Sequence, residues 1–192
     1  VMIQFIKTRD VKSPLRNAAE NAGIDFYIPE NNDDFIHDLA VKNPDVALVK
    51  NVALEPVTEM LKITGANRSF VDEATGKIYI APRKDILIPS GIKSKFPNSL
   101  ALVANNKSGI ATKKKLVFGA SVIDASYQGE WHLHLINTSD SYQEISCGTK
   151  VIQFIPHLIS TDELEVLDLS PEEFYTEKTS RGDGGFGSTG LK

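Results

Sequence analysis

Residues 181–190 (RGDGGFGSTG) bring together several residue types that suit a nucleotide phosphate chain. Glycines let backbone N–H groups approach phosphate oxygens closely, and consecutive amides can form an anion-binding nest. Arg181 supplies a forked donor for phosphate, and Phe186 supplies a flat face on which a base could stack. A glycine-rich tail alone is more often only a flexible segment. The added Arg, Phe, Ser and Thr shift the interpretation toward nucleotide binding.

Asp124 lies in a second candidate segment, residues 121–130 (SVIDASYQGE). Two β-branched residues precede it and a turn with Tyr127 and Gly129 follows, which is typical of a carboxylate at a β-hairpin. One interpretation is a base that activates water. The other is a turn-capping Asp that bonds its own turn amides.

Residues 105–111 (NNKSGIA) form a third candidate segment, followed by lysines at 113–115. Lys107, the Ser108 hydroxyl and the small Gly109 suit phosphate oxygens. A lysine run is more often a solvated loop, so both interpretations stay open.

Short strand signals surround these segments. Residues 2–6 and 22–28 are rich in β-branched and aromatic side chains, which favour strands. Further strands, separated by turn residues, are expected at 85–89, 99–104, 115–118, 131–136, 150–156 and 163–169. This regular spacing predicts a mainly β fold, either a β-barrel or a jelly-roll-like sandwich.

Residues 30–79 differ in texture and predict a small α+β insertion. A helix capped by Asp33 or Asp34 would carry apolar residues 35, 36, 39 and 40 on one side. A second helix is expected over 57–62, and a hairpin over 70–80 with its turn near Gly76. After the strands, Ser170 and Glu173 form a capping box that opens a short C-terminal helix of about two turns. The glycine-rich arm at about 179–192 is expected to be mobile without ligand.

Length, charge and cysteine content narrow the class of protein. The 192 residues suit a single domain over 1–192 that includes the insertion and the arm. A net charge of −4 argues against direct nucleic-acid binding. No apolar run approaches the roughly 20 residues of a membrane span, and the charged Lys7, Arg9 and Asp10 argue against a signal peptide. Because Cys147 is the single cysteine, we expect a soluble protein in a reducing, cytoplasmic compartment.

Taken in order, five segments resemble the motifs of the homotrimeric dUTPase family. They are 22–25 (AGID), 107–111 (KSGIA), 122–130 (VIDASYQGE), 148–153 (GTKVIQ) and 181–190 (RGDGGFGSTG). The last is highly specific and the third is strong, whereas the others are weak alone but lie in the expected order. Outside residues 30–79, the resemblance covers nearly the whole chain.

This resemblance implies a β-barrel or jelly-roll homotrimer that hydrolyses dUTP to dUMP and pyrophosphate, in active sites shared between subunits. By resemblance, Asp124 would be the base for the water that attacks the α-phosphorus. Tyr127 would pack under the deoxyribose and exclude a 2′-hydroxyl. Mg²⁺ would bind the substrate phosphates, with Asp25 supporting them or the metal through water. A structural turn Asp is an equally weighted alternative for Asp25.

The resemblance also implies further contacts with the nucleotide. Backbone groups around Ala120 and Ser121 would read uracil, because cytosine would leave buried groups unpaired. The phosphate chain would be held by Lys107, Ser108, Gly109, Gln153 and Arg181. The arm would close over the nucleotide as a lid through Phe186, Gly187, Ser188 and Thr189, with Phe186 stacked on uracil.

Several positions depart from the family pattern. Lys107 stands where Arg is usual and lacks the bidentate fork. Ser126 replaces a common acidic residue, and Ser121 a common glycine. The insertion at 30–79 could cover an outer face, contact a neighbouring subunit or bind another protein. Two alternatives to the hydrolase follow: a nucleotide-binding regulatory protein that acts through the insertion, and a related dCTP deaminase, which the C-terminal arm disfavours.

Other reactive residue types have simpler interpretations. His132 and His134 alternate with apolar neighbours, which is ordinary strand patterning rather than a zinc pair. Cys147 beside Gly148 has no evident base partner, so a packing role is favoured over a nucleophile.

Overall fold

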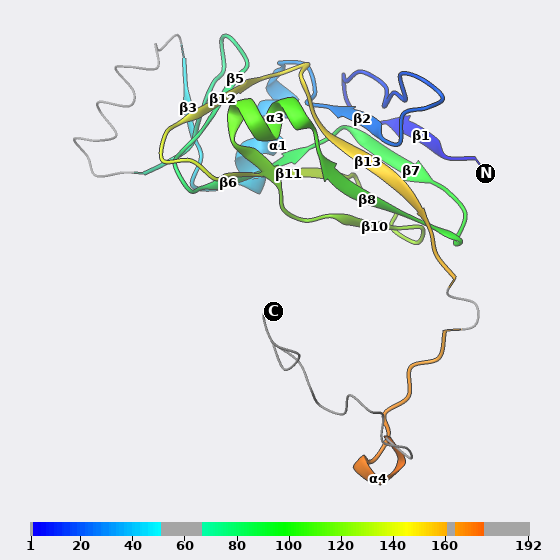
Figure 1. Ribbon diagram of the computed structural model, residues 1–192. Coiled ribbons are helices and arrows are strands. Elements are labelled where there is room, and N and C mark those ends of the chain that lie inside the picture. The colour runs from blue at the N-terminus through cyan, green and yellow to red at the C-terminus, as the bar shows by residue number, and fades with distance from the viewer. Residues whose placement is uncertain (1, 51–66, 161–163, 175–192) are drawn as a thin grey trace, which may run out of the picture. The chain divides into compact units, whose positions relative to one another are not determined.

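The computed structural model describes residues 2–50, 67–160 and 164–174. The chain divides into two units, Val1–Ile159 and Ser160–Lys192. Among the described residues, the first unit consists of short strands in small sheets with two short helices (Figure 1). The described part of the second unit contains one helical turn, α4 (Pro171–Phe174).

The elements of the first unit follow one another as short segments. In chain order they are β1 (Gln4–Lys7), β2 (Ile24–Tyr27), α1 (Asp33–Lys42), β3 (Ala47–Val49), β4 (Phe70–Asp72), β5 (Lys77–Ile80), β6 (Asp85–Pro89), β7 (Ile92–Lys95), β8 (Leu100–Asn106), α3 (Ser108–Lys114), β9 (Leu116–Phe118), β10 (Val122–Asp124), β11 (His132–Asn137), β12 (Gln143–Ser146) and β13 (Lys150–Leu158).

These strands form sheets in the orders β10-β8-β13-β2, β6-β11-β9, β12-β5-β4-β3 and β1-β7. The strand pairs are antiparallel except for β3 with β4, which is parallel. Antiparallel sheets with one buried face read as alternating apolar and polar residues, as β11 does. The predicted mainly β, jelly-roll-like fold is confirmed.

An aromatic cluster fixes the sheets to one another. Trp131, just before β11, is fully buried and stacks on Phe26 of β2 with ring centroids 4.9 Å apart. Phe154 of β13 and Phe5 of β1 meet these rings edge-on. Such pairs add to the burial of large apolar surface. The cluster therefore fixes β2 and β13, which carry candidate site residues, against β11.

Helix α1 opens the insertion, and its N-cap, Asn32, lies one residue before the first predicted cap, Asp33. Asn32 has an extended backbone, and its Oδ1 accepts a hydrogen bond from the Phe35 N–H at 2.9 Å. The prediction of Asp33 or Asp34 as the cap is therefore wrong. The carboxylates of Asp33 and Asp34 lie in the first turn, where negative charge interacts favourably with the positive end of the helix dipole. The predicted apolar face of α1 is buried.

The rest of the described insertion is joined to the β core. The predicted hairpin is confirmed as β4 and β5, and Gly76 takes a φ of +67° in its turn. β5 also pairs with β12. The Asn43 side chain bonds both the N–H and the C=O of Leu87 on β6, at 2.8 and 2.9 Å. The helix expected over 57–62 lies outside the described residues, and the division into domain, insertion and arm stays a prediction.

Two predictions about local structure are wrong. The loop interpretation of the lysine run is wrong for Lys113 and Lys114, which lie in the last turn of helix α3, where basic side chains are favourable; Lys115 ends the helix in a left-handed conformation (φ 54°). Residues 164–169 are irregular rather than a strand, and Leu164, Val166 and Leu167 are exposed. A strand needs a neighbour to satisfy its backbone groups, and this segment has none in the described single chain.

The described C-terminal helix begins as predicted. The Glu173 carboxylate accepts hydrogen bonds from the Ser170 hydroxyl at 2.7 Å and from the Ser170 N–H at 3.1 Å. The reach from the third helical residue back to the cap is the mark of a capping box. None of the helices within 2–50, 67–160 and 164–174 is long and apolar enough to cross a membrane.

Candidate active site

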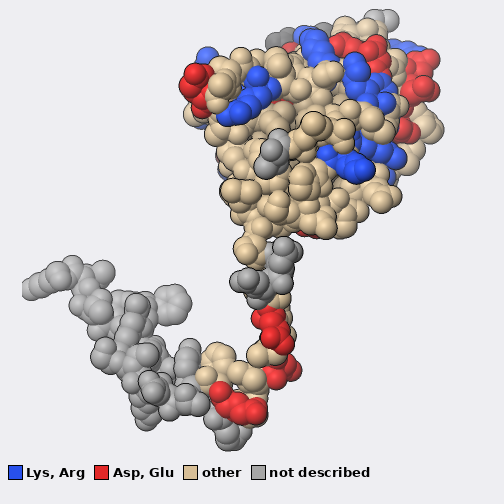
Figure 2. All heavy atoms as spheres, turned by 90° about the vertical axis from the view of Figure 1, so that its right-hand side faces the viewer, with Lys and Arg blue, Asp and Glu red and all other residues tan. Residues whose placement is uncertain are grey.

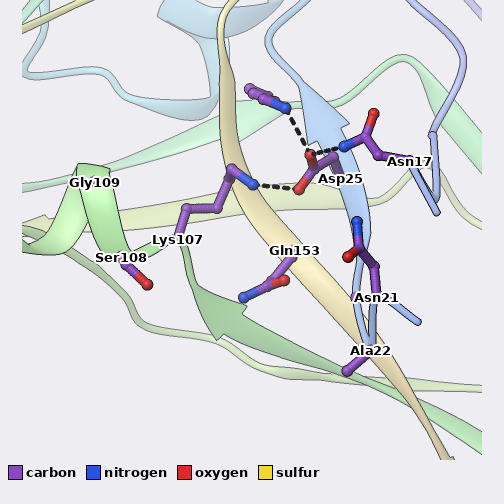
Figure 3. A pocket seen from close by; sticks show the side chains of 10 residues that line it. Asn17, Asn21, Ala22, Asp25, Lys107, Ser108, Gly109 and Gln153 are labelled. Carbon is purple, nitrogen blue, oxygen red and sulfur yellow. Dashed lines mark hydrogen bonds and ion pairs between the residues drawn. The ribbon is translucent and has the colours of Figure 1, made fainter.

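One pocket of about 390 Å³ brings five predicted site residues together (Figure 3). They are Asp25, Lys107, Ser108, Gly109 and Gln153. Neighbouring strands explain the meeting, because Asp25 on β2 pairs with Gln153 on β13, and Gln153 pairs with Asn105 at the end of β8. α3 starts directly after β8 and adds Ser108 and Gly109. We call this the β2 pocket.

The Asp25 carboxylate is the electrostatic centre of the β2 pocket. Its side chain is only 5% exposed. Lys107 Nζ donates to Oδ1, while Lys150 Nζ and Asn17 Nδ2 donate to Oδ2 at 3.0 and 3.1 Å. Figure 3 shows Lys107 and Asn17 reaching Asp25 from opposite sides. Burial raises the pKa of the Asp25 carboxyl, but hydrogen bonds and charges from the two lysines lower it further, so the net pKa is below its ordinary value.

Lys150 is a pocket residue that the sequence analysis did not assign. It lies in the recognised segment 148–153, but strand alternation would place residues 150 and 153 on opposite faces. The register shifts between Lys150 and Ile152, so Lys150 lies opposite Tyr27 and Gln153 opposite Asp25. Both side chains are thereby placed on one face of the sheet.

Glycine positions shape the same pocket. The Gln153 side-chain amide donates to the Asn106 carbonyl at 2.9 Å. A Cβ on Gly23 would lie 2.2 Å from Gln153 Oε1, so only glycine at 23 leaves room for this amide. A Cβ on Gly109 would meet no atom within 4 Å. The space beside Gly109 is therefore open to a ligand.

A second pocket, of about 210 Å³, holds the other described site residues. Asp124, Ser121 and Tyr127 line it together with Ala120 and His132. We call this the hairpin pocket. Asp124 is exposed at the end of β10, and Tyr127 is 43% exposed. The Tyr127 N–H donates to the Asp124 carbonyl at 3.1 Å, so a tight turn keeps the carboxylate and the ring close in the chain.

An ion pair between the partly buried side chains of Arg9 and Glu130 supports the turn that carries Tyr127. The Tyr127 hydroxyl donates to the Glu130 carbonyl at 2.9 Å. The Glu130 carboxylate accepts two hydrogen bonds from Arg9, both at 2.8 Å, and one from the Gly91 N–H. Burial raises the pKa of Glu130, but the hydrogen bonds from Arg9 and Gly91 lower it further, and the net pKa is below its ordinary value. Arg9 was not among the predicted site residues, because it lies far from Glu130 in the chain and no local pattern links the two.

The two pockets lie far apart on the sheet β10-β8-β13-β2. Asp124 and Asp25 are on its two edge strands. Asp124 pairs with Ala101, whereas Asp25 lies level with Asn105, four residues further along β8. At about 4.8 Å per strand and about 3.3 Å per residue, their Cα atoms are about 20 Å apart along the sheet. One chain therefore does not bring Asp124 to the lysines of the β2 pocket.

Positive charge in the first unit is local rather than general. Figure 2 shows Lys and Arg on one face in separate patches divided by uncharged and acidic surface. The whole chain has a net charge of −4. Because salt screens exposed charges beyond about 8 Å, the other basic patches add little at the β2 pocket, where Lys107 and Lys150 share one carboxylate.

Five predicted site residues cannot be placed. Arg181, Phe186, Gly187, Ser188 and Thr189 lie outside the described residues. Among the residues that are described, no three His, Cys, Asp or Glu side chains lie close enough to hold a metal ion. Both Asp25 oxygens already accept hydrogen bonds from ammonium groups. With three donors on about four lone-pair sites, Asp25 keeps room on Oδ1 for one more donor, such as a metal-bound water.

The strand histidines and Cys147 lie where their sequence patterns predicted. On β11, His132 and His134 alternate with buried apolar residues, as the strand patterning predicted. Burial and the Glu30 charge raise the pKa of Cys147 to about 12. Its thiol is therefore protonated at neutral pH, which supports the predicted packing role.

Comparisons with known proteins point to one family. A family model described as dUTPase matches residues 73–190. A deoxyuridine 5′-triphosphate nucleotidohydrolase of Wolbachia pipientis subsp. Culex pipiens (strain wPip) is 34% identical over 115 residues, which are 59% of this chain and 72% of that protein. A protein of the same name from Yarrowia lipolytica is 34% identical over 130 residues, which are 65% of this chain and 80% of that protein.

Solved structures share the fold beyond the matched residues. The dUTPase of Staphylococcus bacteriophage 80alpha with dUPNHPP is 17% identical with a TM-score of 0.64, covering 99% of both chains. A dUTPase from phage phi11 of S. aureus, studied for its species-specific insert, is 15% identical with a TM-score of 0.58, covering 89% of this chain and 99% of that one. The fold likeness thus extends to described residues before position 73, which the family model does not match.

Proposed function

Because the chain belongs to the dUTPase family, we propose that it hydrolyses dUTP to dUMP and pyrophosphate by attack of an Asp124-activated water on the α-phosphorus. The reaction class is that of a dUTP diphosphatase. The observation that carries the finer assignment is the separation of two complementary half-sites. The β2 pocket is cationic, and the hairpin pocket holds an exposed carboxylate beside an aromatic ring.

The β2 pocket is suited to the phosphate chain. Lys107 and Lys150 are held side by side by Asp25, which reduces the entropy lost when they engage a ligand. Each ammonium has three donors, so both keep N–H groups for phosphate oxygens. Ser108 and Gly109 offer a hydroxyl and an accessible backbone, and Gln153 adds a neutral donor. The charge of Lys150 offsets the missing Arg fork at position 107.

The hairpin pocket is suited to the nucleoside and the attacking water. A carboxylate within hydrogen-bond reach of a water can remove its proton as it attacks. Asp124 is exposed and can take that position. The Tyr127 ring, held by Glu130, would pack under the deoxyribose and leave no room for a 2′-hydroxyl. Ala120 and Ser121, which line the same pocket, would read uracil through their backbone groups.

Mg²⁺ is proposed to bind the phosphate oxygens of the substrate and to neutralise their charge. The described residues do not form a ligand set of their own, so among them the contribution to charge neutralisation comes from Lys107 and Lys150. A water-mediated contact of Asp25 with the metal remains part of the proposal. Such a water would donate to Asp25 Oδ1, which accepts a single hydrogen bond, from Lys107, among the described residues.

The separation of about 20 Å between the half-sites of one chain calls for more than one copy, and the number three is proposed from the dUTPase family. A neighbouring copy must supply the β2 pocket to each hairpin pocket, which makes the site incomplete without it. The exposed apolar residues Leu164, Val166 and Leu167 are further surface that an assembly could bury. The C-terminal arm, with Arg181, Phe186, Ser188 and Thr189, is proposed from its sequence to close over the nucleotide.

The first test is pyrophosphate release with Mg²⁺ from dUTP, dCTP, dTTP and UTP in parallel. Release from dUTP alone is expected, and release from none, or a deaminated product from dCTP, would overturn the proposed function. Asp124→Asn should lower kcat by about 10³-fold while the Kd of dUTP stays within about twofold. Asp45→Asn, at an exposed carboxylate away from both pockets, is the matched control. Normal turnover by Asp124→Asn would remove Asp124 from the role of base.

A mixing experiment tests the shared site directly. Asp124→Asn and Lys107→Ala each inactivate a different half-site. Randomly reassembled trimers should recover about a quarter of the active sites, because each site draws its two halves from different copies. No recovery, with mixed trimers verified by native mass spectrometry, would refute the shared site.

A further inference from the structure

We propose that His134 is a positioning residue for base recognition, acting as a neutral bridge between Asp85 and the backbone of the hairpin pocket. The inference rests on the proposed function, which gives Ala120 and Ser121 the task of reading uracil. It concerns a residue that lies outside the five recognised motifs. Its support is a continuous chain of hydrogen bonds rather than any one contact.

His134 holds two consecutive amides at the start of the hairpin. The Gly119 N–H donates to the His134 carbonyl at 3.0 Å, and the Ala120 N–H donates to His134 Nδ1 at 2.9 Å. On the other side of the ring, Nε2 lies 2.8 Å from Asp85 Oδ2 on β6. Both the backbone and the ring of His134 therefore fix where residues 119 and 120 lie.

The partners of the ring determine its tautomer. A backbone amide can only donate, so Nδ1 must be unprotonated to accept the Ala120 N–H. The ring proton is then on Nε2 and donates to Asp85. A carboxylate behind a histidine fixes both its tautomer and its orientation. The His134 side chain is 22% exposed, whereas Asp85 is 62% exposed, so the inner contact is the stronger one.

Close packing against His134 leaves no room for a side chain at position 119. A Cβ on Gly119 would lie 2.1 Å from His134 Nδ1 and 2.5 Å from its Cε1. The imidazole is thus in direct contact with the Gly119 backbone, and any other residue at 119 would push the ring or the hairpin away. From the other side, the Ala104 N–H on β8 donates to the Ser121 carbonyl at 2.7 Å. Hydrogen bonds from two strands, β11 through His134 and β8 through Ala104, therefore hold residues 119–121.

These bonds decide which groups remain to read a base. The Ala120 amide and the Ser121 carbonyl are already used. Within the part of the chain that the structure describes, the Ala120 carbonyl and the Ser121 amide have no hydrogen-bond partner, which leaves an acceptor followed by a donor. Uracil offers the complementary N3–H donor and carbonyl acceptor, whereas cytosine presents an acceptor at N3. His134 contributes to selectivity because it takes the Ala120 N–H out of the recognition set and fixes the orientation of its carbonyl.

The test compares His134→Val with His134→Asn in the full-length protein with Mg²⁺. Valine removes the acceptor, while asparagine can place its side-chain oxygen near the position of Nδ1. His134→Val should raise KM for dUTP about tenfold, equal to about 1.4 kcal/mol, with kcat changed less. Its preference for dUTP over dCTP should fall by a similar factor, and His134→Asn should recover most of both. His37→Asn, at an exposed histidine of α1, is the matched control.

Two further measurements keep the proposal falsifiable if His134→Val does not fold. Asp85→Asn, on an exposed partner, should raise KM only about twofold. Side-chain ¹⁵N NMR of the wild-type protein should show His134 protonated at Nε2 and not at Nδ1 at neutral pH. The Nδ1–H tautomer, or an unchanged KM in a folded His134→Val, would overturn the proposal while dUTP hydrolysis stands. Absence of hydrolysis in the wild type would instead refute the proposed function. The NMR result would still show whether His134 bridges Asp85 and the Ala120 N–H.

Discussion

Replacing Asp25 by asparagine tests the electrostatic centre of the β2 pocket. The change keeps the size of the side chain but removes the charge that holds Lys107 and Lys150. An amide also points an NH₂ group toward one of the two ammonium groups, where donors oppose each other. At neutral pH the variant therefore loses both ion pairs and the hydrogen bond to one of the two lysines, at a side chain that is only 5% exposed.

The size of the effect follows from the exposure of the two lysines. Charge-assisted hydrogen bonds contribute about 1.5–3 kcal/mol when shielded from water. Lys107 is 21% exposed, so its bond falls in that range, whereas Lys150 is 43% exposed and its bond contributes about 0.5–1 kcal/mol. We expect Asp25→Asn to lower the free energy of unfolding by about 2–3 kcal/mol at pH 7.

The stability that the Asp25 charge contributes depends on pH. The folded pKa of Asp25 is lowered, so its contribution to stability is present above the unfolded pKa of about 3.9. That contribution is lost as the pH falls through the still lower folded pKa. The difference between wild type and Asp25→Asn should therefore shrink progressively below about pH 4. Other carboxylates titrate in both proteins and cancel in the difference.

Urea denaturation followed by tryptophan fluorescence is the assay. Trp131 is the single tryptophan and is fully buried, so its emission reports unfolding of the core. Protomer concentration must be equal in all samples, because an oligomer's stability depends on it. Asp45→Asn, at an exposed carboxylate, should stay within about 0.5 kcal/mol of wild type. A stability loss that is the same at pH 3 and at pH 7 would refute the role of the Asp25 charge.

Two further predictions concern steric room and the buried ion pair. Gly23→Ala should push the Gln153 amide out of place, since the new Cβ would lie 2.2 Å from its Oε1, and initial rates should show KM for dUTP raised about threefold to tenfold; an unchanged KM would exclude Gln153 from substrate binding. Glu130→Gln should lower the free energy of unfolding by about 3 kcal/mol in the fluorescence assay, because Arg9 is 11% exposed and would keep only Asp38 as a charged partner. A loss below about 0.5 kcal/mol would show that the pair is not stabilising.

Patterns local to the sequence predicted local structure well. Alternation of apolar and polar residues placed the strand His132–Asn137 within one residue of its bounds, and glycine placed the turn at Gly76. Prediction of local structure failed where the conformation depends on a partner that is distant in the chain. Residues 164–169 have strand-like composition, yet without a neighbouring strand they are irregular in the single chain. Asn32 rather than Asp33 caps α1, because Asn and Asp are nearly equivalent caps and only the backbone of residue 32 distinguishes them.

The site was predictable as a set of residue types, but its arrangement was not. Nothing in the sequence shows that Asp124 and Asp25 lie on opposite edges of one sheet, since that depends on strand order. Resemblance supplied the residues, and only the structure divided them into two half-sites. Arg9 and His134 were missed for the same reason, because each acts through a partner distant in the chain.

Lys150 shows how one irregularity of the backbone can create a site. In a regular strand, residues 150 and 153 face opposite sides of the sheet, because side chains alternate with a period of two. A pattern-based prediction must therefore assign only one of them to the pocket, and Gln153 was the one assigned. The shift in register between Lys150 and Ile152 leaves two consecutive buried residues, Val151 and Ile152, and returns Lys150 to the face of Asp25. The second ammonium group of the β2 pocket thus depends on a bulge. Deleting one residue of this bulge would leave positions 150 and 153 two residues apart, so Lys150 would be expected to stay opposite Tyr27 on the face of Asp25 in a regular strand.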